Sequence, residues 1–300
     1  MAIFADAMGA IGYYIALPFI HLLAWLPFPL LYRVSDLLYL LLYRVVGYRR
    51  QIVLTNLRNS FPEKSEAEIR KIADGFYRWF CDLVLETLKT LSISPEQVQK
   101  RVTLGGTEDL RTYAAKGQSV ILVLGHHGNW EMAGARYSQE KGLPPLYVIY
   151  HPLENKYFDR LLHHMRTRHG TRLYTMRETS KAMLRDRDVL TATAFIADQT
   201  PSPEKAYWTT FLGQDTPVFF GTEAMARKLG YPVIYISISR PRRGYYHLQL
   251  ESLIGEPSMA THGAITEAHT ARLERDIRRD PELWLWTHRR WKHKRPAQDR

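Results

Sequence analysis

Two side chains that could carry acid–base chemistry lie five positions apart in residues 125–131, which read Gly-His-His-Gly-Asn-Trp-Glu. Side chains five positions apart on a regular α-helix are about 140° out of phase, so His126 and Glu131 cannot share one helix face. They can meet if His126 sits on a turn and Glu131 lies in the first turn of the next helix, with Asn129 as its N-cap. The spacing therefore suits a histidine base whose other ring nitrogen is held by a carboxylate.

The residues alone leave a second chemistry open at this segment. A metal-dependent hydrolase could use a larger set of ligands and acids: His126, His127, Glu131 and Asp198. Adjacent histidines rarely bind one ion, because neighbouring side chains on an extended chain point apart. The sequence contains no Gly-x-Ser-x-Gly motif, and no serine or cysteine nucleophile is evident. General-base catalysis without a metal is the favoured interpretation.

The elements that must position this segment alternate between strands and helices. Residues 120–124 form a continuous apolar run, as expected for a strand buried on both faces. Other strands are expected at 189–197, 232–239 and 245–251, and helices at 132–137, 154–169 and 222–229. This alternation predicts an α/β fold with a mostly parallel sheet flanked by helices. The glycine-rich segment then follows a strand end, where such sheets collect their chemistry.

An amphipathic helical region is expected at residues 48–89, with a break at 61–65. Ser65 and Glu68 have the spacing of a capping box for the second helix. Apolar residues recur after it at helical spacing and are expected to pack in the core: Phe76, Phe80, Val84 and Leu88.

The N-terminal segment is apolar, with no acidic or basic residue between positions 7 and 32. Its length would suit a membrane span, but Pro18, Pro27 and Pro29 favour a kinked or interfacial helix. The arginines that follow place the rest of the chain in the cytoplasm by the positive-inside rule. We therefore expect residues 1–45 to be a membrane anchor or interfacial helices, and residues 46–300 to be one catalytic domain. The alternative is an apolar helical hairpin packed on a soluble domain.

The chain is basic, with a formal net charge of +11, which favours anionic partners such as phospholipid head groups, an acidic carrier protein or nucleic acid. Arginine binds phosphate in a bidentate manner, and Arg166 and Arg168 are our candidates for substrate contacts. A nucleic-acid binder remains a rival class, but no nucleic-acid motif is recognisable and such a protein would not need the apolar N-terminus. We expect no nucleic-acid partner. The single cysteine, Cys81, excludes an intramolecular disulfide.

His126, four intervening residues and Glu131 resemble the catalytic motif of the bacterial lipid A biosynthesis (late) acyltransferases and their lysophospholipid acyltransferase relatives. Further matches keep their order across roughly the whole chain. They are Tyr48-Arg49-Arg50, Asn56-Leu57, Phe61-Pro62-Glu63, Ala197-Asp198-Gln199, Phe211-Leu212-Gly213, Thr216-Pro217, residues 221–230 and His288-Arg289-Arg290-Trp291-Lys292.

The resemblance implies a glycerol-phosphate-acyltransferase-like fold, anchored by an N-terminal hydrophobic helix on the cytoplasmic face of the inner membrane. It implies transfer of an acyl chain from acyl-carrier protein or acyl-CoA to a lipid acceptor, with no other cofactor and no metal. His126 is then the general base and Glu131 its supporting acid. Asn129, Trp130 and Asp198 are expected to contact substrate. A lipid A precursor is the expected acceptor, although the Gly-Asn-Trp version of the motif also occurs in relatives with lysophospholipid or other lipid acceptors.

Overall fold

The computed structural model describes residues 2–296, and the side chains from residue 9 onward. Seven strands form one sheet in the order β1-β9-β8-β2-β5-β3-β4, in which only the β8–β9 pair is antiparallel. The strands are β1 (Val102–Gly105), β2 (Val120–Leu124), β3 (Leu146–Tyr150), β4 (Arg172–Thr175), β5 (Ala192–Ile196), β8 (Val233–Arg242) and β9 (Tyr245–Ile254). A separate hairpin joins β6 (Ala206–Phe211) to β7 (Gln214–Phe219). The predicted mostly parallel α/β fold is confirmed.

The register of the two central strands decides where the site lies. Every residue of β2 is buried, and β2 pairs in parallel with β5 so that Leu124 lies opposite Ile196. The Ala197 amide also donates to the Leu124 carbonyl oxygen at 3.2 Å, which extends the pairing beyond the strand ends. The residues two places after each strand, His126 and Asp198, therefore emerge at the same sheet edge.

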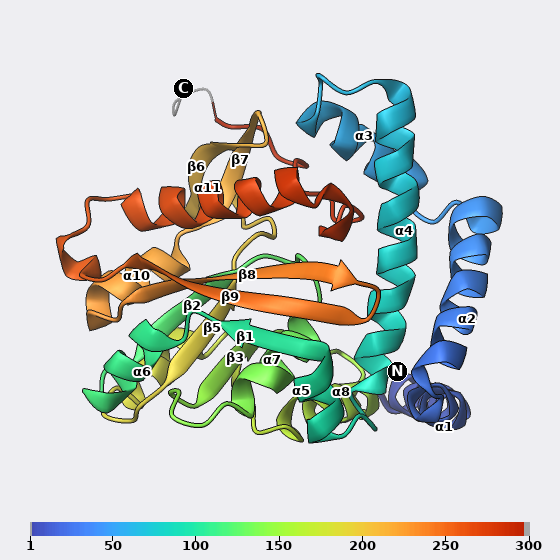
Figure 1. Ribbon diagram of the computed structural model, residues 1–300, viewed down its shortest axis with the longest axis horizontal. Coiled ribbons are helices and arrows are strands. Elements are labelled where there is room, and N and C mark those ends of the chain that lie inside the picture. Colours follow the sequence, from blue (N-terminus) through green and yellow to red (C-terminus); the bar gives the residue numbers. More distant parts are fainter. Residues whose placement is uncertain (1, 297–300) are drawn as a thin grey trace.

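Alternate side chains of β2 enter two apolar clusters, one on each face of the sheet. Leu122 and Leu124 pack with α5 (Pro95–Arg101), α6 (Glu108–Ala115) and α7 (Trp130–Ser138). Ile121 and Val123 pack in the cluster that includes α9 (Thr179–Arg185), α10 (Gly221–Leu229) and α11 (Ala264–Arg279). Figure 1 shows α11 lying along one face of the sheet. The site is thus held by a sheet whose two faces are both covered.

The helical region at 48–89 has the predicted break. It divides into α3 (Arg50–Ser60) and α4 (Glu66–Lys89), and Ser65 closes the expected capping box: its amide donates to Glu68 at 2.8 Å, and its Oγ accepts from the Glu68 amide. Phe76 is buried as predicted, but Val84 is 38% exposed, so the prediction that it packs in the core is wrong.

The N-terminal residues form helices that pack on α4. They are α1 (Ala2–Trp25), α2 (Phe28–Tyr39) and a π-helix (Leu40–Val46), and Figure 1 shows α1 and α2 on the outer side of α4. The Lys89 ammonium group ties the end of α1 to α4, because it donates to the carbonyl oxygens of Ala24 at 2.7 Å and Leu26 at 2.8 Å.

The prediction of an N-terminal membrane helix is not supported in its spanning form. No helix within residues 2–296 combines the length and the apolar composition needed to cross a membrane. The helical segment instead breaks before Pro27, because the proline nitrogen carries no hydrogen to donate to a continuing helix. The resulting helices, of 24 and 12 residues, pack against α4, as in the alternative of apolar helices packed on the domain.

Candidate functional site

The glycine-rich segment forms a tight turn between β2 and α7. Gly128 adopts φ +67°, and a Cβ atom there would lie 2.4 Å from Cγ2 of Ile238, so only glycine fits. A late part of the chain pairs with this turn: the Gly128 amide donates to the Leu283 carbonyl oxygen at 2.9 Å, and the Leu285 amide donates to the His126 carbonyl oxygen at 3.1 Å. The backbone around His126 is therefore fixed from both sides.

The ring of His126 is oriented by Asp198. Nδ1 of His126 lies 2.6 Å from Oδ1 of Asp198, and the backbone amide of His126 donates to Oδ2 at 2.8 Å. A carboxylate in this position holds Nδ1 as the protonated nitrogen, which leaves Nε2 with its lone pair toward the adjoining cavity. The side-chain nitrogen of Gln199 lies 3.5 Å from that Nε2. The pair has the geometry of a base and its orienting acid.

Asp198 is kept ionised beneath the histidine. Burial alone would raise the pKa of Asp198, but attraction to His126, together with hydrogen bonds from His126 and Trp284, outweighs burial and holds this pKa well below its usual range. The bond from Trp284 Nε1 to Oδ2 measures 2.8 Å and is fully buried. The Asp198 carboxylate lies behind the imidazole and is occupied by protein donors, so this geometry gives no support to the predicted substrate contact.

Glu131 does not hold His126, contrary to the sequence prediction. It lies in the first turn of α7 and faces α8 (Lys156–Thr167), where Nη2 of Arg166 is 2.5 Å from Oε1 and Nε is 3.0 Å from Oε2. Burial alone would lower the pKa of Arg166, but the charge of Glu131 and its hydrogen bonds raise that pKa above its ordinary value. The two predicted residues, Glu131 and Arg166, thus form one bidentate ion pair.

Asn129 is the N-cap of α7, as predicted. Its Oδ1 accepts from the Met132 amide at 2.9 Å, and its Nδ2 donates to Glu86 at 2.7 Å. The residue is wholly buried. Both ends of its amide bind protein groups, so this geometry gives no support to the expected substrate contact.

Of the other predicted residues, Trp130 lines the cavity and Arg168 makes structural contacts away from it. Trp130 lies edge-on to His126, with ring centroids 4.9 Å apart, and lines the cavity. Arg168 does not reach the cavity, because its Nη1 donates to the carbonyl oxygens of Thr90 at 2.6 Å and Ile93 at 3.0 Å. Arg168 therefore holds the loop after α4, and this geometry gives no support to its predicted role as a phosphate ligand.

His127 points away from His126, as expected for neighbours on an extended chain. Its ring nitrogens lie 3.1 Å from the carbonyl oxygen of Ile238 and 3.2 Å from that of Asp280, and burial lowers its pKa. Within the described part of the chain, no three His, Cys, Asp or Glu side chains are grouped to hold a metal ion. The ligand set of the alternative hydrolase is therefore not assembled.

A cavity of about 490 Å³ opens at His126. Its polar end is formed by His126, Glu131, Arg166 and Gln199. Elsewhere its walls are mostly apolar and come from α7, α8 and the strands, with Ala133, Val148, Met165, Ala194, Ile236 and Leu248 among them. A mostly apolar cavity with a few polar groups at one end is typical of a site for a long apolar ligand.

The α/β fold places a histidine–aspartate pair at the mouth of a mostly apolar cavity, an arrangement suited to an enzyme that acts on an apolar substrate. The chain matches the family model for bacterial lipid A biosynthesis acyltransferases over residues 2–293, and it belongs to that family of acyltransferases.

Curated relatives agree with the family model. The lipid A biosynthesis lauroyltransferase of Escherichia coli is 26% identical over 277 residues, which are 90% of this chain and 88% of the relative. The lipid A biosynthesis acyltransferase of Haemophilus influenzae is 21% identical over 92% of this chain and 86% of its own. The lipid A biosynthesis myristoyltransferase of Escherichia coli is 24% identical over 54% of this chain and 50% of its own.

Two residues at the site were not among the predictions from sequence. Trp284, which binds Asp198, lies in a stretch whose tryptophans and basic residues gave no sign of a partner. Glu86, which binds Asn129, lies inside an amphipathic helix. An acidic residue on the apolar side of an amphipathic helix could have indicated this contact from the sequence, since carboxylates are rarely buried without partners.

Proposed function

We propose that the protein transfers a fatty acyl chain from an acyl thioester to a hydroxyl group of a lipid A precursor, with His126 as the general base. The observation that carries the proposal is the pairing of His126 Nδ1 with Asp198 at 2.6 Å, while the ring borders an apolar cavity. This arrangement leaves Nε2 able to take a proton where an acyl chain can be held.

The reaction follows from that arrangement. Nε2 of His126 removes the proton of the acceptor hydroxyl, and the oxygen forms a bond with the thioester carbonyl carbon. The tetrahedral intermediate collapses with cleavage of the carbon–sulfur bond, and the imidazolium returns its proton to the departing sulfur. Asp198 stabilises the imidazolium between the two steps. No covalent enzyme intermediate is needed.

The donor is an acyl-carrier protein thioester or acyl-CoA. The apolar walls of the cavity suit the acyl chain, and the ion pair of Arg166 with Glu131 marks the polar end where the thioester and acceptor meet. Acyl-carrier proteins are acidic, and the net charge of +11 favours such a partner.

The acceptor is assigned from the relatives, whose names specify lipid A biosynthesis. The sequence left other lipid acceptors open because of the residues Gly128-Asn129-Trp130. Gly128 packs on Ile238 and Asn129 is wholly buried, so neither can read the acceptor. The turn explains why these positions carry glycine and asparagine. These two residues therefore give no reason to prefer a lysophospholipid as the acceptor.

The reaction is proposed to occur at the cytoplasmic face of the inner membrane. One side of α1 exposes a row of large apolar residues, among them Ile15 (63%), Phe19 (64%), Leu22 (62%) and Trp25 (74%). The π-helix adds Leu41, Val45 and Val46, and Arg33 and Arg44 are exposed on the same group of elements. An apolar face with nearby arginines is the composition of an interfacial helix on an anionic membrane.

Thioester consumption by purified protein tests the mechanism. Lauroyl-acyl-carrier protein and lauroyl-CoA are each offered with a lipid A precursor or a lysophospholipid. We expect His126→Ala to lower kcat roughly 10²-fold or more, since it removes the base. Wild-type rates in His126→Ala would contradict the mechanism, and transfer to the lysophospholipid alone would contradict the acceptor. Mass spectrometry of lipids from cells with and without the protein identifies the acceptor independently.

A further inference from the structure

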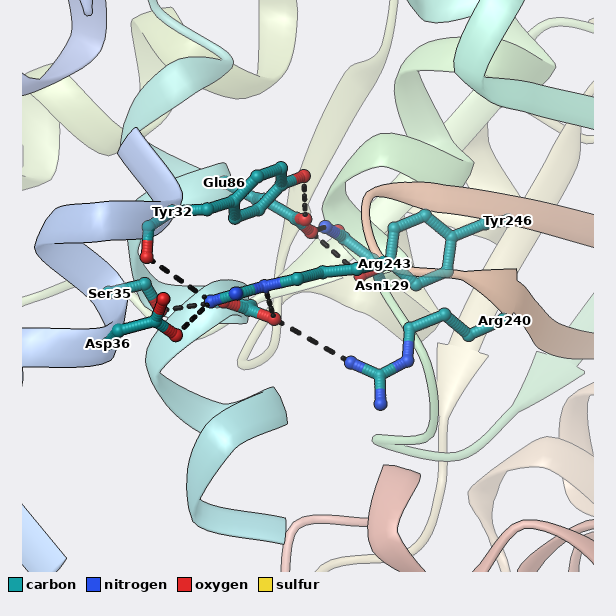
Figure 2. Close-up of polar contacts among 9 residues, drawn as sticks. Tyr32, Ser35, Asp36, Glu86, Asn129, Arg240, Arg243 and Tyr246 are labelled. Atoms are coloured by element: carbon teal, nitrogen blue, oxygen red, sulfur yellow. Dashed lines mark hydrogen bonds and ion pairs between the residues drawn. The ribbon is translucent and has the colours of Figure 1, made fainter. Parts of the chain in front are cut away.

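The carboxylate of Glu86 lies at a junction of three elements. It is wholly buried on α4 and accepts hydrogen bonds from Tyr32 of α2 at 2.8 Å and from Tyr246 of β9 at 2.7 Å. It also accepts a hydrogen bond at 2.7 Å from Asn129, which belongs to the turn between β2 and α7 (residues 125–129, the catalytic turn). Figure 2 shows these side chains converging on it. An ionised carboxylate only accepts, and these three donors occupy three of its roughly four acceptor positions.

The hydroxyl groups are held as donors. Burial, reinforced by the neighbouring Glu86, raises the pKa values of Tyr32 and Tyr246 above their ordinary values, so both remain protonated. Burial raises the pKa of Glu86 as well, and the hydrogen bonds from its three partners oppose that rise.

The orientation of Asn129 is set by its two partners together. Its Oδ1 must accept, since it caps the Met132 amide, and its Nδ2 must therefore face Glu86. An aspartate could cap the helix equally well but would place a second carboxylate against Glu86. A capping role alone does not explain why position 129 carries asparagine and not aspartate. The contact with Glu86 does explain it.

The same junction reaches the N-terminal helices. Tyr32 belongs to α2, and two further contacts hold that helix to α4 and the β8–β9 hairpin: Ser35 Oγ donates to Asp82 at 2.6 Å, and Arg243 bridges Asp82 at 2.6 Å and Asp36 at 2.8 Å. Figure 2 shows Arg243 between α2 and α4, with Arg240 approaching from the same side. Glu86 connects these contacts of α2, made by Tyr32, Ser35 and Asp36, to the catalytic turn.

We propose that Glu86 is a positioning residue for acyl transfer, which holds the catalytic turn through Asn129 and ties it to α2 through Tyr32. Asn129 directly precedes Trp130 and Glu131 and lies three residues after His126, so a shift of its side chain moves the groups at the polar end of the cavity. The readout in activity rests on the proposed function, whereas the structural readout below does not.

The first test compares Glu86→Gln with Glu86→Leu. Glutamine can present its oxygen to Asn129 and its nitrogen to the hydroxyl oxygen of Tyr32, so kcat should stay within roughly tenfold of wild type. Leucine offers no acceptor, and the displaced turn should lower kcat roughly 10²-fold with little change in KM for lauroyl-CoA. Rates are normalised to folded protein, and Tyr246→Phe serves as a control that removes one donor and leaves the Asn129 contact.

The second test exchanges donor and acceptor. Asn129→Asp places two carboxylates in contact, which must share a proton, so its kcat should acquire a new loss as pH rises. Adding Glu86→Gln restores one donor and one acceptor, and the double variant should lose that pH dependence. Amide hydrogen exchange at Met132, which does not depend on catalysis, should be faster in Glu86→Leu and Asn129→Asp and should recover in the double variant.

Equal kcat in Glu86→Gln and Glu86→Leu, or unchanged exchange at Met132 in Glu86→Leu, would overturn the proposal. If His126→Ala retains full activity, the proposed mechanism fails, but exchange at Met132 still decides the role of Glu86. If Glu86→Leu does not fold, the Asn129→Asp and double variants carry the decision: an Asn129→Asp protein with the pH profile and exchange of wild type overturns the proposal.

Discussion

Glu131 binds Arg166, with 2.5 Å between Oε1 and Nη2, while Asp198 takes the place beside His126. The motif acid and the acid that orients the His126 ring are therefore different residues, which come from different elements. The finding separates two roles that the spacing of the motif had assigned to Glu131 alone.

Asp198→Asn should lower kcat on the order of 10³- to 10⁴-fold, by analogy with the aspartate of serine-protease triads, because an amide cannot stabilise the imidazolium.

Glu131→Gln should act through Arg166 instead. The double variant Glu131→Gln/Arg166→Met should then be no worse than the poorer single variant, with a coupling energy of about 0.5–3 kcal/mol in kcat/KM. Additive losses in steady-state assays would show that the two residues act separately.

Folding stability should depend on pH through His269 of α11. Burial lowers its pKa from 6.5 to about 4 in the folded protein, so between these values the unfolded chain binds a proton that the folded chain does not. The contribution of His269 to stability should therefore fall as pH drops from 6.5 toward 4, by roughly 3 kcal/mol. Urea denaturation across this range measures the effect. His269→Gln should reduce the slope without removing it, because burial lowers the pKa of His288 to about 4 as well. His21→Gln, at an exposed residue, is the control.

Gly128→Ala should destabilise the protein and abolish activity, whereas Gly117→Ala should cost less. Both residues have positive φ, +67° and +66°, so both pay the backbone cost of a side chain, about 1–3 kcal/mol. Only Gly128 also meets a neighbour, at 2.4 Å from Ile238, whereas Gly117 has open space. Thermal unfolding and thioester consumption measure the two effects. Equal losses in both variants would mean that the packing on Ile238 is unimportant.

Association with anionic vesicles should depend on the apolar face of α1. Phe19→Glu and Leu22→Glu should each weaken binding roughly tenfold or more, because a charge replaces an apolar side chain at the interface. Val189→Glu is the matched control, since Val189 is 45% exposed but lies between α9 and β5, outside the N-terminal helices. Vesicle sedimentation gives the partition coefficients. A loss of the same size in the control would point to a general effect of charge.

The sequence was most informative where structure is local. The apolar run at residues 120–124 and the capping box at Ser65 depend on neighbours in the chain, and both features are present in the structure. Asn129 as an N-cap belongs to the same class.

The contacts that define the site are not local, and the sequence did not predict them. Whether Glu131 meets His126 or Arg166 depends on how α7 packs against α8, which no spacing within residues 125–131 specifies. The partnership of His126 with Asp198 follows from the register of β2 against β5, and hydrophobic patterning locates two strands without aligning them. The burial of Asn129 required Glu86, 43 residues away, to be placed behind it.

The pairing of the catalytic turn with residues 283–285 also bears on the order in which the enzyme matures during synthesis. The turn is made early in translation, but its backbone partners at Leu283 and Leu285, and the indole that binds Asp198, are made more than 150 residues later. The N-terminal helices leave the ribosome while the site still lacks these partners. A chain released before Trp284 would carry every residue of the motif and remain inactive.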